Sequence, residues 1–108
     1  MFRLDGHRIG DAWYYADNET VHAWFLAMPL DQKTGWRIDH CVSCDLEHWE
    51  YAGTALEPGP ADAWDGKSLA TGSVIRREGQ YWMAYTGHKY EAAFVQRAGM
   101  AVSDDLVN

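Results

Sequence analysis

The stretch "HCVSCDLEHWEYAGTAL", residues 40–56, carries two overlapping patterns, and the choice between them decides the fold. One is C-x-x-C, formed by Cys41 and Cys44, which is typical of zinc sites and redox pairs. The other is S-x-D-L-x-x-W, which runs from Ser43 to Trp49 and is typical of a turn that leads into a strand. The rest of the chain indicates which pattern matters.

The S-x-D-L pattern recurs 60 residues further along the chain. "CVSCDL" (41–46) aligns without gaps with "AVSDDL" (101–106), and four of the six positions are identical. At the same offset, "VHAWFLA" (21–27) aligns with "YWMAYTG" (81–87). A repeat of this length indicates one supersecondary unit used twice, as in the blades of a β-propeller.

This repeat argues against a metal or redox role for the cysteines. Ala101 and Asp104 occupy the positions that correspond to Cys41 and Cys44, so the unit does not require sulfur there. A single C-x-x-C is a weak zinc signal, even with two histidines nearby. A redox C-x-x-C needs a helix N-terminus, whereas this one lies at the end of a predicted strand. We therefore predict no metal site and no cofactor.

The turn interpretation assigns structural roles to the polar residues of the stretch. Ser43 and Asp45 are predicted to cap backbone N–H groups, as short polar side chains do in tight turns. Trp49 is predicted to anchor the strand that follows. His40 and His48 are interpreted as structural by the same reasoning.

Short β-like runs separated by turn signals make up most of the chain. They cover residues 11–16, 20–28, 35–43, 50–56, 70–77, 81–87 and 97–103. The run at 20–28 is apolar on both faces, which indicates a strand that is covered on both sides. The sequence thus predicts an all-β chain of antiparallel β-propeller blades. The first unit spans 1–57, a linker spans 58–68, and an incomplete second unit spans 69–108.

Composition excludes several classes of protein. The chain has 108 residues, which corresponds to one domain at most, and a net charge of −7 without a basic cluster. A nucleic-acid surface needs such a cluster to neutralise phosphates, so we expect no nucleic-acid partner. No apolar run is long enough for a membrane span, and the first residues lack the apolar core of a signal peptide. A cytoplasmic location is therefore expected.

At this point the motifs resemble those of a known family. Residues 40–58 resemble the pattern H-A-x-S-x-D-L-x-H-W…G-x-A-L-x-P of glycoside hydrolase family 32, the β-fructosidases. "WDGKSLATGSVIRREGQYWMAYTG" (64–87) resembles the W-D…S-G-S…Y-T-G motifs of the next blade. Family 43 shares weaker versions of them. The resemblance implies part of a five-bladed β-propeller, of which this chain supplies fewer than two blades.

The resemblance also implies an active site at the propeller axis. Glycosidases of this kind use two carboxyl groups, an acid and a nucleophile or base. Asp11 matches the position of the family's nucleophile or base, although its sequence context differs. The acid and a third carboxylate belong to motifs that this chain does not contain. We therefore expect no hydrolysis by this chain alone, and the sequence favours neither retention nor inversion of configuration.

Sugar-binding residues are implied at four positions. Trp64, Thr71 and Ser73 correspond to the family's sugar pocket, and Trp13 offers a further aromatic face for stacking on a sugar ring.

Two other classes of function stay open. One is a carbohydrate-binding module without catalysis. The other is an interaction protein that forms homo-oligomers, with "MFRL" at the N-terminus pairing with the last strand of the same chain or of a partner.

Overall fold

The structure is a computed structural model that describes residues 2–33, 35–60, 62–89 and 96–106. Every regular element in these ranges is a β-strand. The strands are β1 (His7–Asp17), β2 (Thr20–Pro29), β3 (Arg37–Ser43), β4 (Glu50–Leu56), β5 (Ser68–Arg77), β6 (Gln80–His88) and β7 (Gln96–Ser103). No helix in the described part of the chain is long and apolar enough to cross a membrane.

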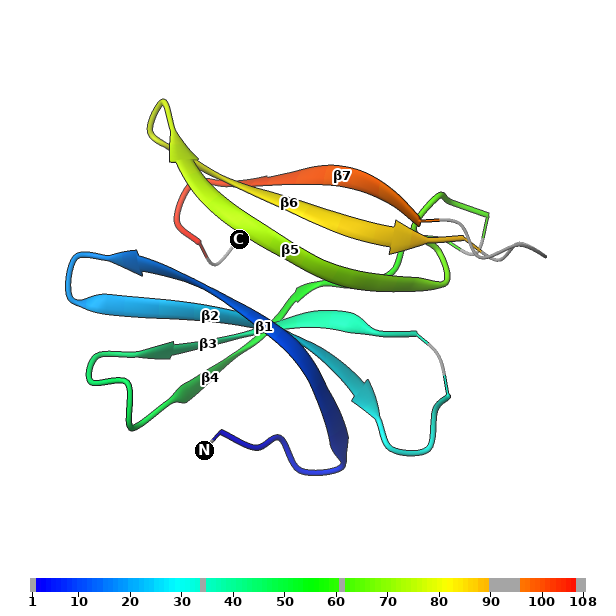
Figure 1. Ribbon diagram of the computed structural model, residues 1–108, viewed down its shortest axis with the longest axis horizontal. Coiled ribbons are helices and arrows are strands. Elements are labelled where there is room, and N and C mark those ends of the chain that lie inside the picture. Colours follow the sequence, from blue (N-terminus) through cyan, green and yellow to red (C-terminus); the bar gives the residue numbers. More distant parts are fainter. Residues whose placement is uncertain (1, 34, 61, 90–95, 107–108) are drawn as a thin grey trace.

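The strands form two antiparallel sheets with sequential order, as Figure 1 shows. The first sheet has the order β1-β2-β3-β4, and the second has the order β5-β6-β7. In both sheets each strand pairs with the next one along the chain, so the topology is a meander. The predicted all-β, antiparallel architecture is therefore confirmed.

The first strand of each sheet contains a β-bulge. In β1 the register against β2 shifts between Ile9 and Ala12. In β5 the register against β6 shifts between Ala70 and Ser73. β1 also begins at His7, four residues before the predicted start. The predicted strand was too short because the residues before the bulge still pair with the end of β2.

The main core lies between the two sheets. From β2, Trp24 and Leu26 point into this core, and Met83 contributes to it from β6. β1 and β5 make the main strand-to-strand contact across the interface. The second sheet therefore covers one face of the apolar β2 strand.

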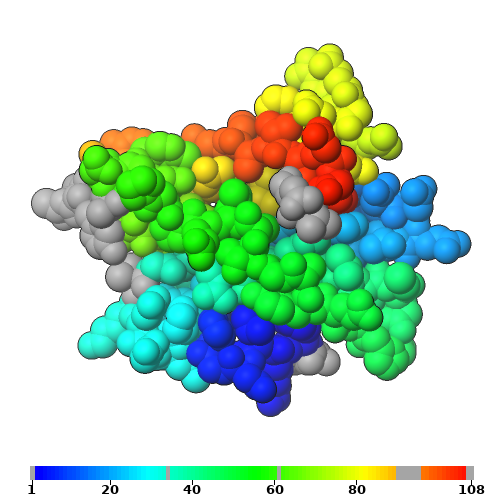
Figure 2. Space-filling model, turned by 180° about the vertical axis from the view of Figure 1, so that it is seen from behind, coloured from blue at the N-terminus to red at the C-terminus, as the bar shows by residue number. Residues whose placement is uncertain are grey.

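The opposite face of β2 is covered by the chain's own N-terminal segment. Ala23, Phe25 and Ala27 form a second apolar cluster, against which Phe2 and Leu4 pack. The Phe2 and Phe25 rings lie 5.3 Å apart. Figure 2 shows this segment in dark blue against the first sheet. The expectation that "MFRL" pairs with the last strand of the same chain is wrong for the described part of this segment, because Phe2 and Leu4 cover β2 instead. Pairing with a partner chain stays a prediction.

The two S-x-D-L turns have the same hydrogen bonds, as the repeat predicts. Ser43 Oγ accepts from the backbone N–H of Asp45 at 3.2 Å and of Leu46 at 2.8 Å. In the second turn, Ser103 Oγ accepts from Asp105 at 3.2 Å and from Leu106 at 2.9 Å. The predicted capping role of the serines is confirmed.

Candidate active site

Asp11 and Thr71 meet where the two sheets approach each other. Thr71 Oγ1 donates a hydrogen bond of 2.8 Å to Asp11 Oδ2, and both side chains are exposed. The two residues are 60 positions apart, so they are equivalent positions of the two repeats. The structure thus brings together two of the predicted site residues.

The bulges bring the two side chains together. Asp11 lies inside the β1 bulge rather than at the start of the strand, and Thr71 lies inside the β5 bulge. Gly72, next to Thr71, has no space for a Cβ because the Ala84 carbonyl lies against it. Thr86 Oγ1 donates to the Thr71 carbonyl at 3.2 Å, which fixes the bulge further. The carboxylate and the hydroxyl therefore stand on a well-supported backbone.

The other predicted residues of the second sheet lie close to this pair in sequence but differ in exposure. Ser73 is an exposed residue of β5, directly after the bulge. Trp64 is half-buried in the segment before β5, and its ring lies 5.5 Å from the ring of Tyr85. Its indole ring lies against Gly87 and Gly99 and occupies the space that a Cβ atom at either position would need. Much of the Trp64 ring is therefore used to cover the second sheet.

Trp13 differs from its expected placement. We expected it to offer an aromatic face to a sugar, but it lies mid-strand in β1 and pairs with Trp24. Its side chain is only 7% exposed and belongs to the core between the sheets. Side chains alternate between the two faces of a regular strand, so Asp11 and Trp13, two residues apart, would normally share one face. The bulge breaks this alternation, and the two side chains have different surroundings. Trp13 thus presents no open ring face to a ligand in this structure.

A pocket lined by apolar, aromatic and basic side chains lies beside the Asp11–Thr71 pair. It has a volume of about 340 Å³. Its lining residues are Leu26, Lys33, Trp36, Lys67, Ser68, Leu69, Ala70 and His88. A Cβ at Gly10 would stand 3.6 Å from the Trp36 ring, so this ring packs next to the β1 bulge. Ala70, the residue before Thr71, lines the same pocket, which therefore adjoins both bulges.

Sequence reasoning did not find this pocket. Lys33 and Trp36 follow β2, Lys67 precedes β5, and His88 ends β6, so three separate segments contribute these residues. The available signal was the distribution of lysines. The chain has only three, at positions 33, 67 and 89, and each lies in or beside a connection at this same end of the strands.

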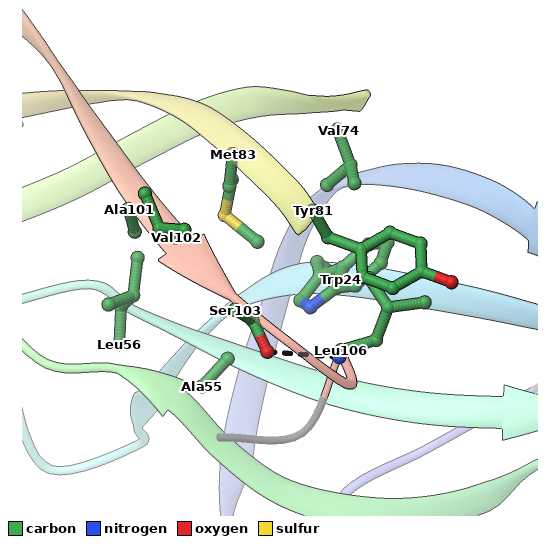
Figure 3. Close-up of a pocket in the computed structure, with 10 residues that line it drawn as sticks. All are labelled: Trp24, Ala55, Leu56, Val74, Tyr81, Met83, Ala101, Val102, Ser103 and Leu106. Atoms are coloured by element: carbon green, nitrogen blue, oxygen red, sulfur yellow. Dashed lines mark hydrogen bonds between the residues drawn. The ribbon is translucent and has the colours of Figure 1, made fainter. Parts of the chain in front are cut away.

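A smaller apolar gap of about 90 Å³ lies between the sheets, as Figure 3 shows. Its polar groups are already engaged. Ser103 Oγ accepts from the Leu106 N–H, and the Tyr81 hydroxyl donates to Asp17 at 2.9 Å. Most of the other lining side chains are apolar. A saccharide would lose its hydrogen bonds to water there, so this gap is part of the core and not a carbohydrate site.

The cysteines have no shared partner in the structure. Cys41 is buried and Cys44 is exposed, and both are free thiols. Burial raises the pKa of Cys41 to about 11, which keeps it protonated at neutral pH. Among the described residues, no group of three or more histidine, cysteine or acidic side chains could hold a metal ion. The histidines of the stretch are bonded elsewhere, His40 to His22 and His48 to Asp45.

Comparison with known families decides which class of protein this fold belongs to. Residues 12–107 match the family model "Glycosyl hydrolases family 32 N-terminal domain". The chain belongs to glycoside hydrolase family 32. The resemblance seen in the sequence motifs is therefore confirmed.

Curated relatives of this family 32 chain are much longer than the chain itself. Over 80 residues it is 32% identical to sucrose-6-phosphate hydrolase of Escherichia coli, an alignment that covers 73% of this chain and 16% of the relative. Over 72 residues it is 34% identical to raffinose invertase of Escherichia coli, covering 66% of this chain and 15% of that protein. The chain thus spans about a sixth of the length of these relatives.

Solved structures of glycosidases share the fold of this family 32 chain. A family 117 glycoside hydrolase of Zobellia galactanivorans, Zg3597, matches 99% of this chain and 39% of its own with a TM-score of 0.83 at 12% identity. The RS223 β-xylosidase matches 94% of this chain and 34% of its own with a TM-score of 0.74 at 18% identity. The two sheets therefore resemble blades of propeller glycosidases.

Proposed function

We propose that the chain is the N-terminal, sugar-binding part of a glycosidase that hydrolyses fructosides or related sugars. In this proposal Asp11 is the nucleophile or general base, and Thr71 and Ser73 contact the sugar. The support for a glycosidase of this kind is membership of family 32 over residues 12–107, together with the names of the two relatives. The match does not include Asp11, whose assigned role rests on the motif resemblance and on its contact with Thr71.

The observation that carries the proposal is the hydrogen bond from Thr71 Oγ1 to Asp11 Oδ2. A carboxylate that attacks an anomeric carbon, or takes a proton from water, must keep one oxygen available while its orientation is fixed. Thr71 occupies one oxygen, and the exposure of Asp11 leaves the other open to a ligand. In this proposal the bond also links the two blades at the point where the sugar binds.

We further propose that this chain alone binds saccharides without hydrolysing them. Hydrolysis needs a second carboxyl group placed across the scissile bond from the first, with a pKa suited to proton donation. No second carboxylate is hydrogen-bonded with Asp11 and Thr71 among the described residues. The chain also covers only 16% and 15% of the two relatives, so most of the length of those proteins has no counterpart in it.

A binding titration tests the proposal. We expect sucrose and raffinose to bind weakly to the chain, to shift the NMR signals of Asp11, Thr71 and Ser73, and to give no released monosaccharide. Asp11→Asn should weaken binding, whereas the matched control Asp104→Asn, at an exposed carboxylate that accepts from Gln80, should not. Turnover above background that disappears in Asp11→Asn would disprove the inactivity. Equal binding by both variants would disprove the assignment of Asp11.

A further inference from the structure

We propose that the N-terminal segment, residues 2–5, reversibly occupies a docking face for a second copy of this chain. When the segment leaves, the outer face of the second sheet of another copy packs there, and the copies stack head to tail. The inference concerns assembly and is independent of the proposed binding of sugars. It follows from a comparison of the surfaces that the two repeats cover and expose.

The docking face lies on the side of the first sheet that faces away from the second sheet. It consists of four buried side chains of β2 and β3: Ala23, Phe25, Ala27 and Cys41. Phe2, Leu4 and Trp49 pack against this face. Figure 1 shows the N-terminus and the second sheet on opposite sides of the first sheet. The N-terminal segment thus covers the side of the first sheet that the second sheet leaves free.

The equivalent face of the second repeat packs on a sheet. At an offset of 60 residues, the positions that correspond to the docking face are Met83, Tyr85, Gly87 and Ala101. Met83 is part of the core between the two sheets, and Tyr85 and Ala101 pack against this core. The strands pair at equivalent positions in both repeats, since Ala23 lies opposite Cys41 and Met83 lies opposite Ala101. The docking face therefore has the strand arrangement that packs on another sheet within this chain.

The open face, on the outer side of the second sheet, supplies the complementary surface. It consists of neighbouring side chains across the strands: Ser73, Ile75, Trp82, Ala84, Met100 and Val102. In the first repeat Tyr15 corresponds to Ile75, and its ring lies 5.7 Å from the Tyr81 ring of the second sheet. Trp24 corresponds to Ala84 and is buried in the core between the sheets. This surface of the repeat is thus covered by a sheet in the first unit and open in the second.

The docking face and the open face can meet without burying a charge. Neither face contains a lysine, arginine, histidine, aspartate or glutamate side chain. The chain as a whole has a net charge of −7, so two copies repel each other over the rest of their surfaces. The centre of a protein interface is depleted of charged residues, because burial of an unpaired charge costs desolvation energy. These two faces are therefore suited to form the centre of an interface between copies.

The N-terminal segment can leave the docking face without breaking a sheet. Residues 2–5 precede β1 and belong to no strand. Phe2 contacts the first sheet through its ring, which lies 5.3 Å from the Phe25 ring and 6.4 Å from the Tyr51 ring. Leu4 adds a second apolar contact. Side-chain packing thus holds the segment on the face, and a second copy offers contacts of the same kind.

Sedimentation of the full chain over a range of concentrations tests the inference. Phe2→Ser with Leu4→Ser weakens the packing of the segment and should tighten self-association at least about tenfold, because an occupied face is only fractionally available to a partner. Head-to-tail contacts form rings or open chains, so this variant should also reach masses above that of a dimer. An unchanged association constant would overturn the inference.

A matched control keeps the length and charge of the segment. Arg3→Ser with Asp5→Ser changes its two exposed side chains, leaves the net charge at −7, and should not alter self-association. Equal tightening by both double variants would overturn the inference, because the apolar contacts would then be irrelevant. Circular dichroism checks the fold. If the apolar double variant does not fold, Leu4→Ala should shift association in the same direction, and no shift would overturn the inference.

A mixing experiment distinguishes head-to-tail stacking from contact between two open faces. The triple variant Phe2→Ser, Leu4→Ser, Val102→Glu has a free docking face and a charge in its open face. It should remain monomeric by itself and yet bind the unaltered chain, whose open face is intact. If open faces instead pair with each other, the triple variant will not bind the unaltered chain, and this result would overturn the inference.

Discussion

His40 shows at the scale of one residue how burial sets chemistry. It is buried, its ring lies parallel to Trp24 at 5.0 Å, and its Nε2 lies 2.8 Å from His22 Nδ1. One imidazole must donate and the other accept, so a second proton would break the bond. Burial, assisted by the nearby His22, lowers the pKa of His40 to about 4, and burial also lowers the pKa of His22.

We expect the protein to lose stability as pH falls from about 6.5 to about 4, the interval between the unfolded and folded pKa values of His40. The unfolded chain binds protons more readily in this interval, so the stability is complete above it and declines as pH falls. The loss should be on the order of 2–3 kcal/mol from His40. Urea unfolding at a series of pH values measures it.

His40→Gln should flatten this pH dependence, because glutamine keeps a hydrogen-bonding side chain without a titrating proton. The control His48→Gln changes an exposed histidine and should retain the full slope. Asp45 does not contribute in this interval, because its hydrogen bonds hold its carboxyl pKa well below the usual range. An unchanged slope in His40→Gln would contradict the assignment.

The two cysteines should react very differently with a thiol reagent. Cys41 is buried and its pKa is raised to about 11, whereas Cys44 is exposed. Only the thiolate is nucleophilic, so at pH 8 we expect one fast-reacting thiol per chain. Cys44→Ser should abolish the fast phase, and Cys41→Ser should keep it.

Elemental analysis should find no stoichiometric zinc, and about one zinc per chain would contradict the turn interpretation.

At the scale of elements, the two S-x-D-L turns share a backbone but differ in surroundings. Leu46 and Leu106 both have positive φ, 66° and 68°, a conformation that is unfavourable for leucine. Leu46 is 63% exposed, whereas Leu106 is 6% exposed and packs in the core between the sheets. The repeat thus imposes the same strain at both positions, and only the second position compensates for it by burial.

Asparagine at these two positions should therefore have opposite effects. Leu46→Asn relieves backbone strain and should leave stability unchanged or raise it by up to about 1 kcal/mol, because asparagine tolerates this conformation. Leu106→Asn removes a buried side chain from the core and should cost about 2–4 kcal/mol. Chemical denaturation of both variants measures the difference. Equal destabilisation by the two substitutions would contradict the claim that the different surroundings of Leu46 and Leu106 decide the effect.

The elements themselves were predictable from sequence, whereas the bulges were not. Alternating apolar residues and turn signals located all seven strands, because those patterns are local. The β1 bulge depends on how His7 to Asp17 register against β2, and no local signal encodes that register. Asp11, the residue that the family motif indicates, consequently lies inside the strand and not at its start.

The residues predicted to bind sugar lie in different surroundings for the same physical reason. Thr71 met Asp11 because the repeat places equivalent residues at equivalent positions. Trp13 did not become an open aromatic surface, because the bulge sends its side chain into the core. Lys33 and Lys67 were not predicted, since the pocket forms only when connections from different sheets are packed together.

At the scale of the whole molecule, the outer face of the second sheet is apolar and open. Ile75 and Val102 lie on either side of Trp82 across the strands, and Met100 follows on the same face as Val102. Ile75, Met100 and Val102 are 55%, 54% and 45% exposed. Adjacent exposed side chains of this kind are typical of surfaces that bind another protein surface.

We therefore expect the chain to form homo-oligomers at micromolar concentration. Light scattering should give a mass above the 12.3 kDa of one chain, and Val102→Glu should lower it by placing a charge in the apolar face. Leu30→Glu is the control, because Leu30 is also exposed, at 56%, but lies directly after β2 and away from this face. A folded monomer in the unaltered protein would contradict this expectation.

The hydrogen bond between Asp11 and Thr71 has a consequence for how such a chain diversifies. Copies of one unit arranged in a ring direct the same position of every copy toward a shared centre. Two ionised aspartates there would repel each other, whereas Asp11 in one copy and Thr71 in the other supply an acceptor and a donor. The turn serines Ser43 and Ser103 remain alike and accept the same backbone hydrogen bonds. A duplicated unit can thus become part of an asymmetric site by a change of one residue at the bulge while its turn stays the same.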